Sequence, residues 1–339
     1  SRLLCAVSDA GASPPPSPCS APVALPPEIT ALLGLSRRDV ADRLPSFLAA
    51  YVHPVDGTRE RVLAQVDACL RSASDEDWAA FTAALPALGA DWGRNDALPL
   101  GRAIIAAFFD PIVSDGSTLF GVEHLQAAVD AQAQGRRVLV VGNHISYVDP
   151  SVIWMLFRRT GLVELSNRLT AVAGPKAYTE PMRLVGATAI HTIRVAQSTA
   201  VASGEAAMAP RDVVRAARTA LDAAAALMDA GRVVIIYPEG RRSRSGSFGP
   251  FLKATARWLT APGTLIVPFG LVGADRLYTL QDDRLRPTLV TGRFGAALDV
   301  DQLVAGGASR GELLVAAHEA VDALLPAELR AIQGAPPVV

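Results

Sequence analysis

The chain lacks the features that mark nucleic-acid-binding and secreted proteins. Its 339 residues hold 32 Lys and Arg against 33 Asp and Glu, a formal net charge of -1, whereas a nucleic-acid footprint needs a clear basic excess. The three cysteines, Cys5, Cys19 and Cys69, have neither metal-ligand nor redox spacing, so we expect no disulfide framework and a reducing compartment. No charged region followed by an apolar region opens the chain, so we expect no secretory signal. We therefore predict a cytoplasmic protein without a nucleic-acid partner.

Long apolar runs and several common catalytic motifs are also missing. The longest apolar candidate, "AIIAAFFDPIV" (103–113), contains Asp110 and is shorter than the roughly 18 residues of a membrane-spanning helix. The chain has no G-x-x-x-x-G-K-[ST], G-x-G-x-x-G or H-E-x-x-H pattern, and its G-x-S-x-G string, "GASRG" (307–311), does not directly follow a strand run as a nucleophile elbow does. This disfavours four large enzyme classes. The five histidines show no metal-ligand spacing, so we predict no metal site and no cofactor.

The first part of the sequence contains a series of helical patterns. Residues 27–115 show helical spacing only, as in "SRRDVADRLPSFLAAYV" with Ser36 as N-cap and "SDEDWAAFTAALPAL" capped by Ser74 or Asp75. We predict a small helical bundle for this part. The preceding residues 1–26 are rich in Pro, Ser and Ala, which is typical of a disordered leader.

After Gly121 the pattern changes to helices that alternate with short buried strands. The strands are "RRVLVVG", "RVVIIYPEG" and "TLIVPFG", and a helix that stops at Gly135 precedes the first of them. This alternation predicts an α/β domain over residues 116–330, with a mostly parallel or mixed sheet flanked by helices. "DRLRPTLVTGRFG" predicts an additional edge strand, and residues 331–339 a flexible tail.

Polar segments follow two of these strands, where ligands bind in such sheets. His144 in "VVGNHISYVDPS" can act as a general base near neutral pH. Asp149 can reach back through a turn and fix the histidine tautomer. A structural interpretation is also open, in which Asp149 and Pro150 are the N-cap and first residue of a helix. The missing serine elbow does not count against catalysis, because the substrate's own hydroxyl would be the attacking group.

The second segment, "YPEGRRSRSG" (237–246), is a basic loop. Between Arg232 and Arg257 there are six basic residues and one acid, Glu239, a local charge of +5. Guanidinium groups bind phosphate bidentately and glycine lets the backbone approach it, so this loop is a candidate anion site. The alternatives are a solvated basic loop and a nucleic-acid loop, which the lack of interleaved aromatics disfavours.

Together these segments resemble the glycerolipid acyltransferase family, which acylates glycerol phosphate and lysophosphatidate. The first family block, N-H-x-S-x-x-D, is matched by Asn143, His144, Ser146 and Asp149. The third block, an aromatic residue followed by P-E-G-T-R-S, is matched by Tyr237, Pro238, Glu239, Gly240, Arg242 and Ser243, with Arg241 in place of threonine. Arg194 fits the end of the second block, although Gly186 lies eight residues before it rather than six. Val267 and Pro268 fit the fourth block.

The resemblance implies transfer of a fatty acyl group from acyl-CoA or acyl-carrier protein to a hydroxyl of a glycerol phosphate. It implies His144 as base and Asp149 as the residue that orients it. The implied substrate-binding residues are Asn143, Ser146, Lys176, Arg194, Glu239, Gly240, Arg241, Arg242 and Ser243. Among them, Arg194, Arg242 and Lys176 would hold the acceptor phosphate.

The resemblance leaves the acceptor open. The third block is similar to that of the lysophosphatidate enzymes, so 1-acylglycerol-3-phosphate is favoured. The helical N-terminal part is similar to soluble plastid-type enzymes that use glycerol-3-phosphate. A phosphate- or lipid-binding module of the same fold without turnover is a further alternative. Because the substrates are lipids, we expect peripheral attachment to a membrane surface through an apolar helical face and the basic loop.

Overall fold

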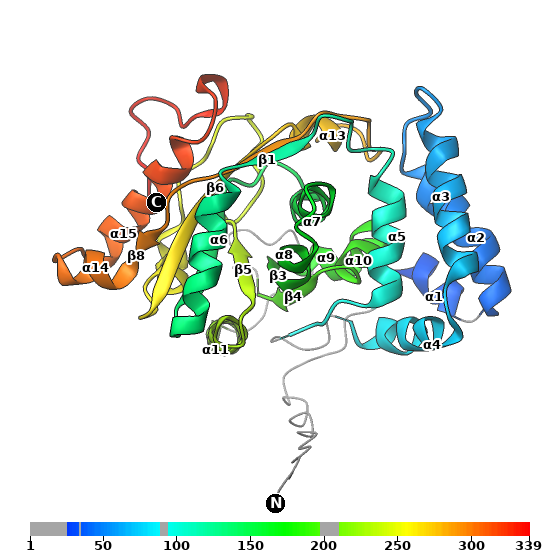
Figure 1. The fold of residues 1–339 in the computed structure, drawn as a ribbon, viewed down its shortest axis with the longest axis horizontal. Helices are drawn as coiled ribbons and strands as arrows, with labels where there is room; N and C mark the ends of the chain where they lie inside the picture. Colours follow the sequence, from blue (N-terminus) through cyan, green and yellow to red (C-terminus); the bar gives the residue numbers. More distant parts are fainter. Residues whose placement is uncertain (1–25, 34, 89–93, 197–209) are drawn as a thin grey trace, which may run out of the picture.

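The computed structural model describes residues 26–33, 35–88, 94–196 and 210–339, and Figure 1 shows how their helices and strands are arranged. The predicted leader lies outside the described residues except for Pro26. The first part of the chain is helical. Its elements are α1 (Pro27–Leu33), α2 (Arg37–Ala50), α3 (Thr58–Ser72), α4 (Asp75–Ala84), a 3-10 turn (Leu85–Ala87) and α5 (Pro99–Phe109).

Helices α2 to α5 pack together, so the prediction of a small helical bundle before the sheet is confirmed. The predicted caps are present. The Ser36 side chain accepts a hydrogen bond from the Asp39 N–H, and the Ser74 side chain accepts one from the Asp77 N–H. These bonds satisfy N–H groups that have no partner within the helix, which fixes where α2 and α4 begin.

The second part of the chain forms the sheet. Its strands are β1 (Thr118–Phe120), β2 (Arg137–Gly142), β3 (Leu169–Ala173), β4 (His191–Arg194), β5 (Val233–Ile236), β6 (Thr264–Val272), β7 (Thr291–Phe294) and β8 (Leu298–Asp299). The order is β1-β7-β6-β2-β5-β3-β4, and β8 pairs with β6. Among the pairs formed by these described strands, β6–β7 and β6–β8 are antiparallel and the others are parallel. The prediction of a mostly parallel, mixed sheet is confirmed.

One strand lies elsewhere than the sequence indicated. "DRLRPTLVTGRFG" contains β7, but β7 lies between β6 and β1 rather than at an edge. The prediction was wrong because β1 has only three residues. So short a strand carries no periodic pattern of its own, yet it covers the outer side of β7.

Helices cover both faces of the sheet and separate its side chains into two cores. The α-helices of this part are α6 (Val122–Asp130), α7 (Asp149–Arg159), α8 (Val163–Arg168), α9 (Lys176–Thr179), α10 (Pro181–Ala187), α11 (Pro210–Asp229), α12 (Ala256–Leu259), α13 (Ala274–Leu277), α14 (Val300–Ala305) and α15 (Arg310–Asp322). Three short 3-10 turns complete it: Ala131–Gln134, Lys253–Thr255 and Ala327–Leu329. Along β2, Val138 and Val140 face the core under α6 and α7, while Leu139 and Val141 face the core under α11 and α15.

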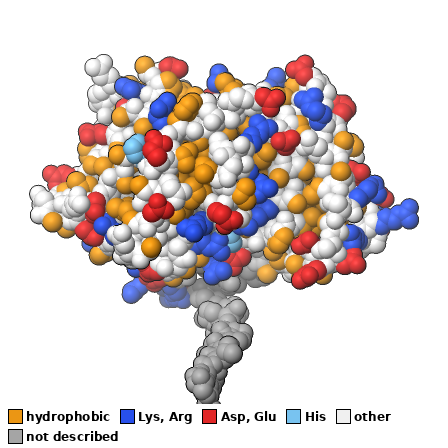
Figure 2. Space-filling model, in the orientation of Figure 1, with side chains coloured by type: hydrophobic (Ala, Val, Ile, Leu, Met, Phe, Trp, Pro, Cys, Tyr) orange, Lys and Arg blue, Asp and Glu red, His pale blue; other side chains and the backbone are white. Residues whose placement is uncertain are grey.

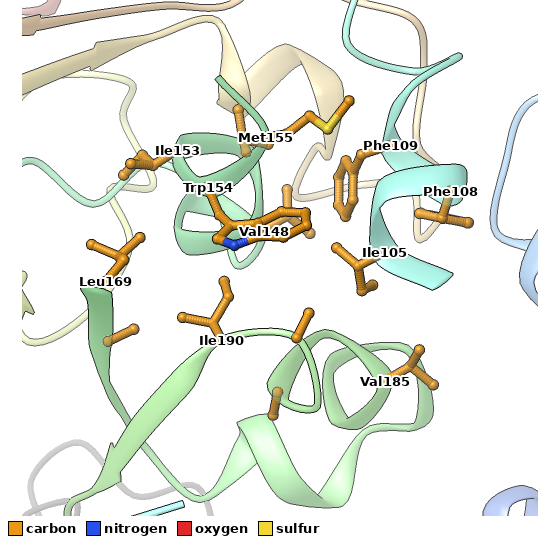
Figure 3. Packing of buried hydrophobic residues seen from close by; sticks show 14 of the residues in the cluster. Ile105, Phe108, Phe109, Val148, Ile153, Trp154, Met155, Leu169, Val185 and Ile190 are labelled. Atoms are coloured by element: carbon orange, nitrogen blue, oxygen red, sulfur yellow. The ribbon is translucent and has the colours of Figure 1, made fainter. Parts of the chain in front are cut away.

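The first of these cores continues into the helical part. Figure 3 shows Trp154 of α7 among Ile105 and Phe109 of α5, with Val185 of α10 and Ile190 below it. The segment after α2 is also joined to the α/β part, because the His53 N–H donates to the Leu285 carbonyl at 2.9 Å. The end of the chain pairs with the segment around Phe251, whose carbonyl accepts from the Val339 N–H at 2.9 Å. The four residue ranges given to leader, bundle, α/β domain and tail stay predictions.

Acidic and basic side chains are interspersed over most of the face in Figure 2, and their numbers nearly balance over the whole sequence. Within the described ranges, no helix combines the length and the apolar character needed to cross a membrane.

Candidate active site

The candidate site is built at the carboxyl edge of the sheet. Strands β2 and β5 are parallel neighbours, with Val141 opposite Ile236. The loops that follow them, which carry His144 and Glu239, therefore start side by side. This is where the sequence predicted the two polar segments to meet.

Asn143 fixes the start of the first loop. Its amide donates from Nδ2 to the Leu271 carbonyl at 2.9 Å and accepts from the Leu271 N–H at 2.7 Å. Both bonds are buried and tie the loop to β6. In the structure Asn143 thus holds the first loop against β6, and its contact with substrate stays a prediction.

His144 and Asp149 form a dyad. His144 Nδ1 lies 2.9 Å from Asp149 Oδ2, and the same oxygen accepts from the backbone N–H groups of Ile145 at 2.9 Å and Ser146 at 3.0 Å. Since two of these neighbours can only donate, the arrangement suits a carboxylate that accepts from Nδ1–H and leaves His144 Nε2 with its lone pair. The N-cap of α7 is Val148, and Asp149 and Pro150 are its first two residues. The interpretation of Asp149 as N-cap was therefore wrong by one residue, and its carboxylate accepts from the turn before the helix instead.

Burial dominates the electrostatics of Asp149. The side chain is fully buried, which raises its pKa, and the hydrogen bonds from His144 and the backbone act in the opposite direction. A buried carboxylate is costly without such partners. The dyad is therefore held in one geometry by the loop itself.

Tyr237 fixes the plane of the imidazole. Its ring stacks on His144 with ring centres 4.6 Å apart and an interplanar angle of 20°. Burial raises the pKa of Tyr237 well above its usual value, and nearby Asp149 adds to the rise, so the phenol stays neutral.

The second loop holds the backbone of His144 on both sides. The His144 N–H donates to Glu239 Oε1 at 2.7 Å, and the His144 carbonyl accepts from the Ser243 N–H at 2.7 Å. The other oxygen of Glu239 accepts from the Gly249 N–H at 2.9 Å. Burial raises the pKa of Glu239 to about 8, against the opposing effect of these two N–H groups. Glu239 therefore positions the histidine and closes its own loop.

Glycine is required next to Glu239 for a steric reason. Gly240 has φ +69°, and a Cβ there would lie 2.4 Å from Leu252 Cδ1. Any other residue would be strained in this left-handed conformation. The P-E-G part of the motif is thus explained by loop geometry.

The remaining predicted residues differ in their contacts and exposure. Ser146 donates weakly to the Tyr278 carbonyl at 3.5 Å, and Ser243 donates to the Ser247 carbonyl at 2.7 Å. Arg241 is exposed in the second loop, and Lys176 is exposed at the start of α9. These side chains occupy the same edge of the sheet, but the contacts of Ser146 and Ser243 are with the protein itself.

Arg194 lies farther along the same edge. It is the last residue of β4, and β5 and β3 separate β4 from β2. With neighbouring strands about 4.8 Å apart, its backbone is roughly 14 Å from that of β2 across the sheet. The side chain is buried, which lowers its pKa. In this structure Arg242 is therefore a nearer neighbour of His144 than Arg194 is.

Sequence reasoning missed two residues beside the dyad, Tyr147 and Arg183. The guanidinium carbons of Arg183 and Arg242 lie over the Tyr147 ring, 3.6 and 3.8 Å from its centre. The Tyr147 ring centre is 6.4 Å from that of His144. Tyr147 occupies a variable position of the first block, and Arg183 belongs to none of the blocks. The one sequence signal for this contact was the position of Arg183, an isolated arginine three residues before Gly186.

Metal ligands are not gathered at this site. Among the residues that the structure describes, no group of three or more His, Cys, Asp or Glu side chains could hold a metal ion.

A known protein family matches the segment that carries the candidate site. Residues 121–272 match the sequence model of the family described as Acyltransferase. This segment contains β2, β5 and both loops of the candidate site. The resemblance to an acyltransferase family that the motifs predicted is confirmed over this segment.

One solved structure that resembles the chain is the 1-acyl-sn-glycerophosphate (LPA) acyltransferase PlsC from Thermotoga maritima. The sequences are 16% identical, the TM-score is 0.40, and the match covers 85% of this chain and 97% of that one. The comparison with curated proteins gave no match.

Proposed function

We propose that the protein transfers a fatty acyl group from a thioester, acyl-CoA or acyl-carrier protein, to a hydroxyl of a glycerol phosphate. The observation that carries this proposal is the His144–Asp149 pair, with Nδ1 engaged at 2.9 Å, next to Arg242 from the neighbouring loop. Among the described residues His144 Nε2 has no hydrogen-bond partner, so this nitrogen can accept a proton.

The reaction needs no acyl-enzyme. His144 Nε2 removes the proton of the acceptor hydroxyl while the hydroxyl oxygen attacks the thioester carbonyl carbon. The tetrahedral intermediate collapses as its C–S bond breaks, and the departing thiolate takes the proton from Nε2. Asp149 stabilises the imidazolium through Nδ1–H but does not itself take up the proton. One ester and one thiol are formed for each thioester and hydroxyl consumed.

We propose 1-acylglycerol-3-phosphate as the favoured acceptor, with glycerol-3-phosphate as the alternative. The phosphate carries negative charge, and the guanidinium of Arg242 lies over the Tyr147 ring, beside His144. Arg194 and Lys176 stay predicted ligands for the same group. Glu239 and Gly240 shape the pocket through the loop that they fix around His144.

A product assay tests the proposal directly. Purified full-length protein is supplied with acyl-CoA and either lysophosphatidate or glycerol-3-phosphate, and the product is identified by mass. We expect phosphatidate from the first acceptor. Acylation of glycerol-3-phosphate alone would select the alternative acceptor. Binding of acceptors without any ester product would indicate the non-catalytic module.

We further propose that the protein works at a membrane surface, because its acceptor and product are lipids. Basic residues of the second loop, such as Arg241 and Arg244, are exposed and can meet anionic headgroups. Flotation with anionic vesicles at low salt should carry the protein upward, and neutral vesicles should not. Equal recovery with both vesicle types would contradict an electrostatic contribution.

A further inference from the structure

Two arginines that are distant in sequence share one aromatic ring beside the catalytic dyad. Arg183 comes from α10, Arg242 from the loop after β5, and Tyr147 from the turn before α7. Since their guanidinium carbons lie 3.6 and 3.8 Å from the centre of the Tyr147 ring, the two groups cannot be farther apart than the sum of these distances. Two groups so near one ring centre lie on opposite faces of the ring, and a phosphate at the edge of the ring can reach N–H groups of both.

The packing of α10 explains how Arg183 reaches this place. Gly186 of α10 lies against the first turn of α7, since a Cβ at Gly186 would meet Ser151 Oγ at 3.4 Å. Residues three apart lie on the same side of a helix, so Arg183 is on the face of α10 that points toward the start of α7. Tyr147 is located there.

Ion pairs within the described part of the chain do not balance the charges of the two arginines. Among the described residues, no carboxylate lies within ion-pair distance of Arg183 or Arg242. Nη1 of each is buried without a hydrogen-bond partner in that part of the chain. Two like charges held close together with unused donors favour the binding of an anion.

Tyr147 is suited to hold these groups without using their donors. A guanidinium that stacks on a ring keeps its N–H groups in its own plane, where they can bind phosphate oxygens in pairs. The stacking also reduces the freedom that each arginine would lose on binding a ligand.

We propose that Arg183 and Arg242, held against Tyr147, together bind the phosphate monoester of the acceptor, and that Arg183 sets the preference for a phosphorylated acceptor. The inference rests on the proposed acyl transfer and assigns a new residue to it. The short distance from the dyad supports the acceptor as the ligand, because the Tyr147 and His144 ring centres are 6.4 Å apart. In a glycerol phosphate only a three-carbon backbone separates hydroxyl and phosphate, whereas a whole pantetheine arm separates the phosphates of CoA from its thioester.

Kinetics of Arg183→Ala test the assignment. Loss of a charge-assisted hydrogen bond to phosphate should raise the KM for lysophosphatidate by about 10- to 100-fold, with less than a twofold change in the KM for acyl-CoA. Arg183→Lys should recover only part of this loss, because lysine lacks the planar fork. Arg293→Ala is the matched control, since Arg293 is exposed and stacks on Phe120 on another strand. Equal changes in both KM values would overturn the inference.

Activity toward monoacylglycerol, which lacks the phosphate, distinguishes a loss of phosphate recognition from a loss of folded protein. Arg183→Ala should lose activity toward lysophosphatidate but keep the wild-type activity toward monoacylglycerol. A parallel loss with both acceptors would mean that Arg183 is structural. Tyr147→Phe should behave like wild type, because the ring is kept, and Tyr147→Leu should raise the KM for lysophosphatidate as Arg183→Ala does.

Calorimetric titration in the absence of thioester separates this inference from the proposed function. Glycerol-3-phosphate and lysophosphatidate are titrated into wild-type and Arg183→Ala protein. Binding by wild type that Arg183→Ala loses supports the phosphate site even if no ester is ever formed. Equal binding by both proteins, together with normal acyl transfer by wild type, would overturn the inference and leave the proposed function standing.

Discussion

A single carboxylate oxygen organises the candidate base. Asp149 Oδ2 accepts from His144 and from two backbone N–H groups of the same turn. The bonds that form the turn therefore also place this oxygen where the imidazole can donate to it. Tyr237 holds the ring plane from one side. The local sequence therefore builds the dyad almost entirely within residues 143–149, and the loop after β5 contributes the remaining contacts.

His144→Ala tests the role of this residue. General base catalysis is typically worth about 10²–10⁴-fold, so turnover should fall by at least the lower figure while the protein stays folded. Steady-state kinetics with acyl-CoA and lysophosphatidate provide the measurement. His124→Ala, which alters a partly buried histidine on α6, should leave the rate unchanged. Near-normal turnover in His144→Ala would rule out the base assignment.

Glu239 predicts a specific pH dependence of stability. Its pKa rises from 4.5 to about 8 on burial. Between these values the folded protein keeps a proton that the unfolded chain has lost, so the free energy of unfolding falls as pH rises through this window. One such group contributes at most about 1.4 kcal/mol per pH unit.

Urea unfolding between about pH 5 and 8 measures this effect. The free energy of unfolding of Glu239→Gln should depend less on pH than that of the wild type. Glu319→Gln, at an exposed position on α15, should follow the wild type. Parallel curves for wild type and Glu239→Gln would show that this carboxyl does not hold a proton in the folded state.

At the scale of residues, sequence spacing predicts the members of the dyad but not the contacts of its surroundings. His144 and Asp149 are five residues apart, so a local turn suffices to join them. Arg183 meets Tyr147 only because α10 packs on the start of α7. The contact of Glu239 with Gly249 is likewise not predictable from spacing, because the shape of the loop brings the two residues together.

Among the secondary-structure elements, α5 connects the helical part to the site. Gly101 of α5 lies directly against Thr188, just after α10. A Cβ at Gly101 would be 2.3 Å from Thr188 Oγ1 and 2.6 Å from the Thr188 carbonyl oxygen. The same carbonyl accepts from the Leu98 N–H at 2.7 Å. The close approach therefore depends on glycine.

Gly101→Ala should destabilise the protein by about 1–3 kcal/mol, the usual cost of overpacking a rigid contact. Gly311→Ala is the matched control, because Gly311 is also in the first turn of a helix but its nearest neighbour, Ser309 Oγ, is 3.9 Å from the added Cβ. That change should be neutral or stabilise by up to about 1 kcal/mol. Urea unfolding distinguishes the two, and equal midpoints would contradict the packing argument.

Strands differ in how well the sequence predicts them. β2, β5 and β6 are apolar runs buried on both faces, which is the strongest strand signal in an α/β domain. β3 and β8 have weaker patterns, and β8 has only two residues. Their positions depend on pairing with β5 and β6, which no local pattern encodes.

At the scale of the whole molecule, the two cores differ in which parts of the chain contribute to them. The core under α11 and α15 stays within the α/β part, whereas the other core combines α2 to α5 with α7, α10 and the sheet. Side chains of α5 such as Ile105 and Phe108 are fully buried in it. Because the helical part and the sheet share this core, we expect them to unfold together.

Ile105→Ala tests this expectation. Removing a buried isoleucine costs about 2–5 kcal/mol, and scanning calorimetry should show one transition, displaced to lower temperature as a whole. Leu313→Ala, in the core under α15, should displace the same transition. If the helical part were independent, the wild type would show two transitions and each variant would move only one of them. A single shared transition would explain why a bundle that carries no residue of the dyad is still needed to hold α10, and with it Arg183, against the start of α7.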